Sequence, residues 1–122
     1  MRGGNKFNAK KTHCAAGHLH DSKMEAGRCD ELMEKEREGL ITHLRQQPRF
    51  TIAINGRAIC TVILDFEYRM ADSGLQIDED VKGRDNPVSR LKRKLIEASY
   101  PGTVVTVWPV KKRKTAKRKV KS

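Results

Sequence analysis

Hydrophobic residues recur every three to four positions in two segments of the chain, the spacing that predicts an amphipathic helix. The first segment covers residues 22–38, and its apolar stripe consists of Met24, Cys29, Leu32 and Met33. Ser22 and Glu25 form a capping box, in which the Ser22 side chain caps the helix and Glu25 reaches back to the Ser22 amide. Gly39 is suited to ending this helix.

The second helical segment covers residues 89–100 and ends before Pro101 and Gly102. Its inward-facing positions are predicted to be Leu91, Leu95 and Ala98. The intervening basic side chains are predicted to point largely outward, and they are Arg90, Lys92, Arg93 and Lys94. We therefore expect a helix with one apolar and one basic face.

Extended segments fill the chain between and after the helices. Residues 40–54 are predicted to form a strand that is interrupted at Pro48, because proline cannot donate to a sheet. Asn55 and Gly56 then predict a tight hairpin turn. Further strands are predicted over residues 58–69, 75–82 and 103–108, and two short extended pieces over residues 12–20. This order predicts an α/β fold, with helices packed on a mixed sheet.

The chain has 122 residues, which is the size of a single domain. We expect an irregular basic lead-in over residues 1–12, a folded domain over residues 13–110 and a disordered basic tail over residues 111–122. No apolar run approaches the roughly 18 residues of a membrane span, and the first residues lack the apolar core of a secretory signal. We therefore expect a cytoplasmic protein with no membrane partner.

The positive charge is concentrated at the C-terminal end. The formal net charge is +11, and residues 111–122 carry eight basic residues and no acidic one. The other 18 basic residues exceed the 15 acidic ones by only three. A basic arm of this kind favours DNA as a partner, since phosphate neutralisation gives sequence-independent affinity. The alternative is a tail that only improves solubility.

Three cysteines, Cys14, Cys29 and Cys60, are widely spaced, which argues against a disulfide framework and favours a reducing cytosol. Histidines at positions 13, 18 and 20 lie close to Cys14 and raise the possibility of zinc. Their spacing matches no closed tetrahedral pattern, and adjacent residues of a strand face opposite ways. We therefore expect no zinc site.

The strands over residues 58–69 and 75–82 carry the most informative chemistry. A turn centred on Asp72 and Ser73 pairs residues whose numbers add up to 145. The predicted pairs on a mostly apolar face are Leu64 with Val81, Phe66 with Glu79 and Tyr68 with Ile77. The predicted pairs on the other face are Asp65 with Asp80, Glu67 with Asp78 and Ile63 with Lys82.

Opposed carboxylates on such a face repel each other, because directly paired side chains have Cβ atoms about 4.5–5.5 Å apart. A hard divalent cation such as Mg²⁺ removes this repulsion and takes oxygen ligands. Lys82 projects to the same face as Asp80, where its ammonium group can orient water or stabilise phosphate charge. The alternative is a solvated acidic face with no ligand.

Asp65 at the end of an apolar strand, followed by Asp80, Val81 and Lys82 on the next strand, resembles the core of the PD-(D/E)XK nuclease superfamily. The sequence is more closely similar to a small phage- and prophage-encoded family of that superfamily, over roughly residues 5–105. The matching motifs are residues 21–26, 47–50, 65–66 and 79–83. Wider relatives of that family include transposon end-cleaving nuclease subunits and archaeal Holliday-junction resolvases.

This resemblance implies a restriction-endonuclease-like mixed sheet flanked by helices, and it implies a role for each matching residue. Asp65 and Asp80 would bind Mg²⁺ or Mn²⁺, with the Val81 carbonyl as a third ligand. Lys82 would position or deprotonate the attacking water. Glu25 would complete the metal shell, and Gln47 would contact metal-bound water or phosphate. Leu64 replaces the proline of the family pattern, and Asp80 replaces its glutamate.

The sequence therefore predicts a metal-dependent endodeoxyribonuclease. Its candidate substrate is branched or nicked phage DNA, cut during recombination in the cytoplasm of a host cell. The residues expected to hold the DNA backbone are Arg90, Lys92, Arg93, Lys94, Lys111, Lys112, Arg113 and Lys114. The alternative is a non-catalytic DNA-binding or architectural protein. Such a small chain could also act as a homodimer or as a subunit of a larger phage DNA-processing complex.

Overall fold

The computed structural model describes residues 11–15, 17–20 and 22–109. Its centre is a four-stranded mixed sheet in the order β3-β6-β7-β8. The strands are β3 (Ile41–Gln46), β6 (Phe66–Met70), β7 (Gln76–Val81) and β8 (Thr103–Trp108). β8 runs parallel to β7, and the other neighbours are antiparallel. The predicted α/β class with a mixed sheet and two helices is therefore confirmed.

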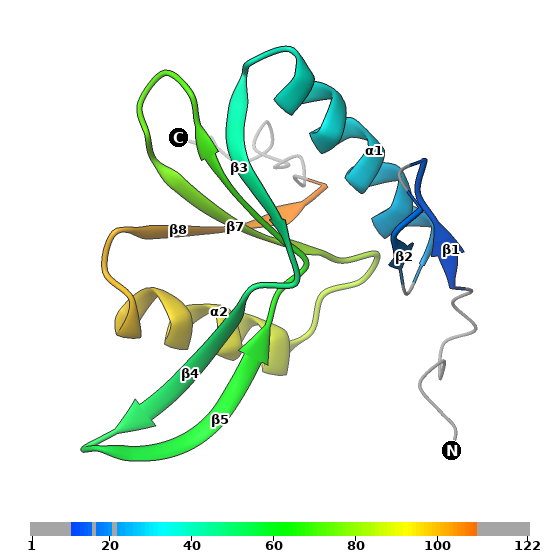
Figure 1. Ribbon diagram of the computed structural model, residues 1–122. Helices are drawn as coiled ribbons and strands as arrows, with labels where there is room; N and C mark the ends of the chain where they lie inside the picture. Colours follow the sequence, from blue (N-terminus) through cyan, green and yellow to red (C-terminus); the bar gives the residue numbers. More distant parts are fainter. Residues whose placement is uncertain (1–10, 16, 21, 110–122) are drawn as a thin grey trace, which may run out of the picture.

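Helix α1 (Lys23–Arg37) covers one face of the sheet (Figure 1). Ser22 caps it by accepting a hydrogen bond from the Glu25 amide, as the capping box predicts. Cys29 and Leu32 are fully buried against sheet residues such as Phe66 and Tyr68. Met24 was expected on the same stripe but is 40% exposed, because it lies just before the buried residues Glu25 and Ala26 and off the face of α1 that they form.

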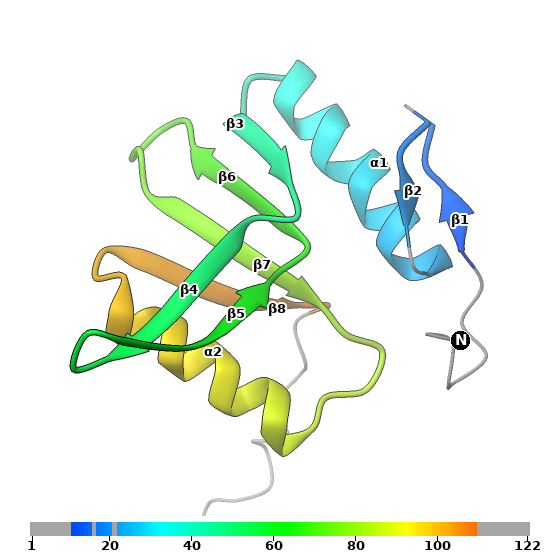
Figure 2. The ribbon, with the colours of Figure 1, turned by 60° about the horizontal axis from the view of Figure 1, so that its bottom comes forward.

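Helix α2 (Pro87–Ser99) covers the opposite face and connects β7 to β8 (Figure 2). It begins two residues before the predicted start, because the Asn86 side chain accepts from the Ser89 amide and Pro87 suits the first turn. Its buried residue is Ile96, with Leu95 partly buried beside it. The expected inward positions Leu91 and Ala98 are wrong, because both are exposed.

A second hairpin extends away from the sheet. It consists of β4 (Arg49–Ile54) and β5 (Arg57–Ile63), joined by the predicted turn at Asn55 and Gly56. The predicted strand over residues 58–69 is wrong in one respect, because it breaks between β5 and β6. The break faces Pro48, which lies between β3 and β4, and the Leu64 amide donates to the Pro48 carbonyl. Two bent strands thus form one long, kinked hairpin (Figure 1).

The register predicted for β6 and β7 is confirmed at Phe66 with Glu79, Glu67 with Asp78, and Tyr68 with Ile77. The predicted pairs of Leu64 with Val81 and of Ile63 with Lys82 are wrong. Ile63 pairs instead with Arg49 of β4, because the chain has already turned away from β7 at the kink.

A small antiparallel hairpin of β1 (Thr12–His13) and β2 (Leu19–His20) lies against α1 (Figure 1). The two expected extended pieces are therefore confirmed. The Ala15 amide also donates to the Asp30 carboxylate of α1. Among the described residues, no helix is long and apolar enough to cross a membrane. The lead-in up to residue 10 and the basic tail predicted over residues 111–122 lie outside the described part of the chain.

Candidate active site

Three carboxyl groups from distant parts of the sequence meet beside one end of β7. Glu25 comes from the first turn of α1, Asp65 precedes β6, and Asp80 lies near the end of β7. Glu25 and Asp80 are each 6% exposed. Burial and the charge of Glu25 raise the pKa of Asp65 to about 8, and the charge of Asp80 adds to this effect. The site therefore concentrates negative charge that the protein only partly compensates.

Backbone groups hold Asp65 firmly in place. Its Oδ2 atom accepts a hydrogen bond of 2.6 Å from the Val81 amide, which favours the ionised form and opposes the rise of its pKa. The Asp65 amide donates to the Glu79 carbonyl, and the Asp65 carbonyl accepts from the Gln47 amide. Gln47 itself has a positive φ of 50° at the kink between β3 and β4. The kink thus positions both Asp65 and Gln47.

Two cationic side chains approach Asp80. Arg93 of α2 donates to Asp80 Oδ2 at 2.9 Å and to Asp85 Oδ2 at 2.5 Å. Lys82 Nζ lies 3.7 Å from Asp80 Oδ1. Hydrogen bonding from Arg93 lowers the pKa of Asp85. Arg93 was expected to contact DNA, yet its side chain is only 11% exposed and pairs with these acids.

The structure brings together the predicted residues Glu25, Asp65, Asp80 and Lys82, with Val81 and Gln47 bonded to Asp65. The remaining basic residues expected on α2 are exposed, and they are Arg90, Lys92 and Lys94. The expected DNA contacts of the tail lie outside the described residues, and they are Lys111, Lys112, Arg113 and Lys114.

Glu25 has a second neighbour that the sequence did not reveal. His20 of β2 is 3% exposed, and its Nδ1 atom lies 2.8 Å from Glu25 Oε2. The capping box predicted that Glu25 reaches back to the Ser22 amide, and it gave no indication of His20. Because β2 lies against α1, the His20 ring takes up one oxygen of this carboxylate. The candidate active site is thereby connected to the β1–β2 hairpin.

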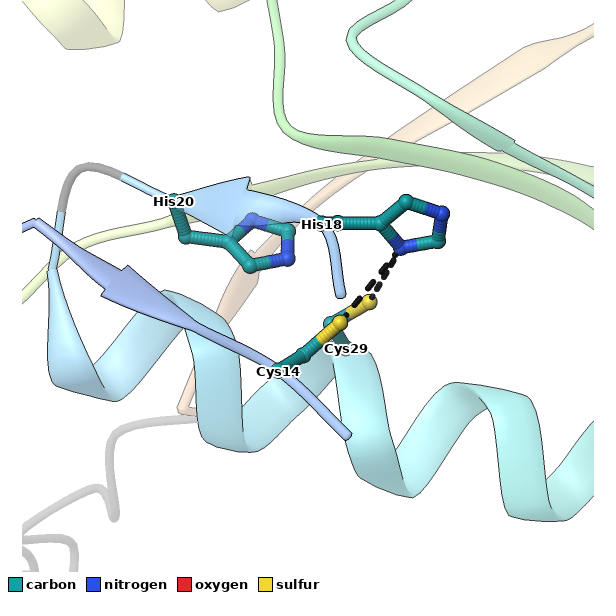
Figure 3. Close-up of side chains that lie close together, drawn as sticks. All are labelled: Cys14, His18, His20 and Cys29. Carbon is teal, nitrogen blue, oxygen red and sulfur yellow. Dashed lines mark hydrogen bonds between the residues drawn. The ribbon is translucent and has the colours of Figure 1, made fainter. Parts of the chain in front are cut away.

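His20 also belongs to a second group of side chains. We call Cys14, His18, His20 and Cys29 the Cys/His cluster; their potential ligand atoms all lie within 4.8 Å of one another (Figure 3). His18 Nδ1 is 3.4 Å from Cys14 Sγ and 3.5 Å from Cys29 Sγ. Within the described part of the chain, the three carboxyl groups do not form a second group this tight.

The sequence predicted no zinc site, but the structure brings four potential zinc ligands together at this hairpin. His13 takes no part in the cluster. The short turn between β1 and β2 instead brings Cys14 to His18, and α1 supplies Cys29 from a distance in sequence. The available signal was the pair of histidines two residues apart, because alternate residues of a strand share a face.

Comparison with known proteins gives one relationship. A family model with the description "Protein of unknown function (DUF1064)" matches residues 4–117. No curated protein and no solved structure matches the chain.

Proposed function

Because this chain belongs to the DUF1064 family, whose description assigns no activity, we propose a function from the site itself. The protein is a divalent-metal-dependent endodeoxyribonuclease with a restriction-endonuclease-like core. The observation that carries this proposal is the meeting of Glu25, Asp65 and Asp80 beside Lys82. The mixed sheet with a helix on each face agrees with the fold that the resemblance implies.

The donor chemistry of this site fits a hard divalent cation. Carboxylate oxygens are the preferred ligands of Mg²⁺ and Mn²⁺. Asp65 and Asp80 would hold the ion together with the Val81 carbonyl, and Glu25 would complete the shell directly or through water. The raised pKa of Asp65, about 8, reflects burial and uncompensated neighbouring charge, which a cation would relieve. When bound, the ion would act as a Lewis acid toward the scissile phosphate.

Asp80 is the residue whose contacts must change most when an ion is present. Arg93 and Lys82 already attract its two oxygens. Positive charge therefore already lies beside this carboxylate. Arg93 can keep its bond to Asp85 while Asp80 turns toward an ion, because the guanidinium group donates to the two acids through different nitrogens.

Lys82 is suited to acting on the attacking water. Its side chain is 30% exposed, so its ammonium group can reach solvent while it remains beside Asp80. There it orients a water molecule for attack and stabilises the negative charge that develops on the phosphate. Gln47 lies exposed next to Asp65 and can contact the same phosphate. Hydrolysis then places the hydroxyl of water on phosphorus and breaks the bond to one sugar oxygen, which leaves as a hydroxyl group with the proton of the water.

The outer face of α2 would hold the DNA backbone. Arg90, Lys92 and Lys94 are exposed on the helix that also supplies Arg93 to the site. Lysine and arginine side chains bind phosphates without reading sequence. Non-specific electrostatic binding of DNA would therefore take place next to the cleavage centre. The shape of the substrate would then determine which DNA structure is cut.

The test is cleavage of labelled duplex, single-stranded, flap and four-way-junction DNA with Mg²⁺, with Mn²⁺ or with EDTA. Asp65→Asn and Asp80→Asn keep the size of each side chain, and we expect each to lower cleavage by about 100-fold or more. Asp72→Asn, in an exposed turn, is the matched control and should cleave like the wild type.

Cleavage that persists in EDTA, or that survives in Asp80→Asn, contradicts the proposal. Absence of cleavage on every substrate, together with DNA binding that is unchanged by EDTA and by Asp65→Asn, would favour the non-catalytic DNA-binding protein. In that case binding should fall steeply with salt.

A further inference from the structure

We propose that the Cys/His cluster binds a zinc ion that fastens the β1–β2 hairpin to helix α1. This site is separate from the carboxyl groups that would hold Mg²⁺ or Mn²⁺, and it does not depend on nuclease activity. Two sulfurs and two imidazole nitrogens are a donor set that zinc prefers, whereas magnesium and manganese prefer oxygen. Figure 3 shows the four side chains converging from the hairpin and the helix.

Two distances within the cluster, from His18 to each sulfur, match those of a tetrahedral zinc site. Bonds of about 2.3 Å to sulfur and about 2.0–2.1 Å to nitrogen, set at the tetrahedral angle, separate the two ligand atoms by about 3.6 Å. His18 Nδ1 lies 3.4 Å from one sulfur and 3.5 Å from the other. A single imidazole nitrogen that is nearly equidistant from two sulfurs occupies one corner of such a tetrahedron.

His20 provides an independent observation. Its ring is 3% exposed, its Nδ1 atom is held by Glu25, and its Nε2 atom is buried without a hydrogen-bond partner among the described residues. A buried imidazole nitrogen without a partner is costly unless something binds it. Figure 3 shows the His20 ring facing the two sulfurs, so a zinc ion among the four side chains would satisfy it.

The contact between His20 and Glu25 is the arrangement that supports metal-binding histidines. Such a histidine commonly donates its other ring nitrogen to a carboxylate, which fixes the ring and increases its basicity. Gln46 adds a similar contact, because its Nε2 atom donates to Cys29 Sγ at 3.6 Å. Both outer contacts stabilise the ligand forms of the residues that they touch.

All four ligands come from the protein, so the site is closed and structural in character. Cys14, His20 and Cys29 are buried, and His18 is exposed at the surface. The hairpin needs such an anchor, because each of its strands has only two residues. Through His20, zinc would also hold Glu25 in position beside Asp65.

The experiment measures zinc in the full-length protein, purified with a reducing agent and dialysed against zinc-free buffer. We expect about one zinc per chain in the wild type and almost none in Cys29→Ser. Cys60→Ser is the matched control, because Cys60 lies on β5 outside the cluster, and it should keep the full amount. Co²⁺ added to the metal-free protein should give the strong visible bands of tetrahedral coordination and a thiolate charge-transfer band.

Two further variants keep the test valid if Cys29→Ser fails to fold. His18→Asn changes the exposed ligand, with little loss of packing, and should abolish the tetrahedral Co²⁺ spectrum. Glu25→Gln leaves the four zinc ligands in place, alters the outer contact with His20 and should weaken zinc binding by about 10- to 100-fold. Asp80→Asn should keep its zinc whether or not it cleaves DNA, so failure of this proposal is distinct from failure of the proposed nuclease.

Three results would overturn the proposal. The first is wild-type zinc far below one per chain, with no tetrahedral Co²⁺ spectrum. The second is equal zinc content in the wild type and in a folded Cys29→Ser protein. The third is wild-type protein that contains no zinc as purified and in which mass spectrometry finds a disulfide between Cys14 and Cys29 despite the reducing agent, which would make the cluster a redox pair.

Discussion

At the scale of single residues, the environment of Glu79 differs most clearly from the one that the alternation of apolar and polar residues along its strand predicted. It pairs with Phe66 on the face of the sheet that was predicted to be mostly apolar, and it is only 1% exposed. Its carboxylate accepts hydrogen bonds from two nitrogens of Arg28, at 2.6 and 2.9 Å, and from the Tyr68 hydroxyl at 2.8 Å. The guanidinium group of Arg28 also lies over the Trp108 ring.

Glu79→Gln should lower the free energy of unfolding by about 2–4 kcal/mol, because it leaves the partly buried Arg28 with only the exposed carboxylate of Glu31 as its counter-charge. Urea unfolding at pH 7 measures this change. Tyr68→Phe is the control and should cost about 1 kcal/mol, because Arg28 still neutralises the carboxylate. A Glu79→Gln protein within about 0.5 kcal/mol of the wild type would contradict this account.

The sequence predicted the position of Glu79 but not its chemistry. Alternation along a strand fixes which residues share a face, so the register of β6 and β7 followed from one turn. The partner Arg28 lies 51 residues away on a helix. Periodicity gives no information on which helical side chain meets which strand. For the same reason, the sequence did not predict the contact of Glu25 with His20 or that of Arg93 with Asp80.

Among the elements, the β4–β5 hairpin depends on its turn. Asn55 has a φ of 51° and Gly56 a φ of 79°, so both central residues adopt the left-handed conformation of a type I′ turn. Asparagine tolerates this conformation, and glycine adopts it without strain. The turn was therefore predictable from two letters of the sequence.

Gly56→Ala should destabilise the protein by about 1–2 kcal/mol, because a side chain with a Cβ atom is strained at this φ. Gly27→Ala is the matched control. Gly27 lies inside α1 with open space around an added Cβ atom, so this change should stabilise the protein by about 0.5–1 kcal/mol. Thermal unfolding of the two variants beside the wild type measures the difference. Equal shifts of the same sign would show that the turn does not constrain this hairpin.

The kink of the same hairpin was less predictable. Pro48 marks the break in one strand, but residues 58–69 contain no glycine or proline to mark the opposing break. The chain changes partners there because Leu64 is buried in the core under α2 while Phe66 is buried in the core under α1. Tertiary packing therefore sets the break, and it also places Asp65 at the corner where the carboxyl groups meet.

At the scale of the whole molecule, the surplus of positive charge is concentrated in residues 111–122. The acids of the candidate site lie inside the domain, paired in part with Arg93 and Lys82. Composition alone predicted the surplus of positive charge over residues 111–122, because a count of residues needs no fold. The Cys/His cluster is the opposite case, because it exists only once the β1–β2 hairpin and α1 are packed together.

Removal of residues 111–122 should weaken DNA binding and reduce its dependence on salt. Each phosphate that a basic side chain neutralises contributes about 0.9 to the slope of log K against log salt for duplex DNA. The eight basic residues of this segment therefore predict a slope that is smaller by several units after truncation. Fluorescence anisotropy with one labelled duplex, from low to physiological salt, measures both slopes.

A full-length variant with glutamine at all eight basic positions of this segment separates charge from length. It should behave like the truncated chain if phosphate neutralisation is the cause. A slope equal to that of the wild type in both variants would place the DNA contacts on the domain itself. The exposed residues Arg90, Lys92 and Lys94 of α2 would then be the next positions to replace. Because these residues flank Arg93, the same variants would also show whether DNA binding by α2 and the carboxyl groups of the site act together in cleavage.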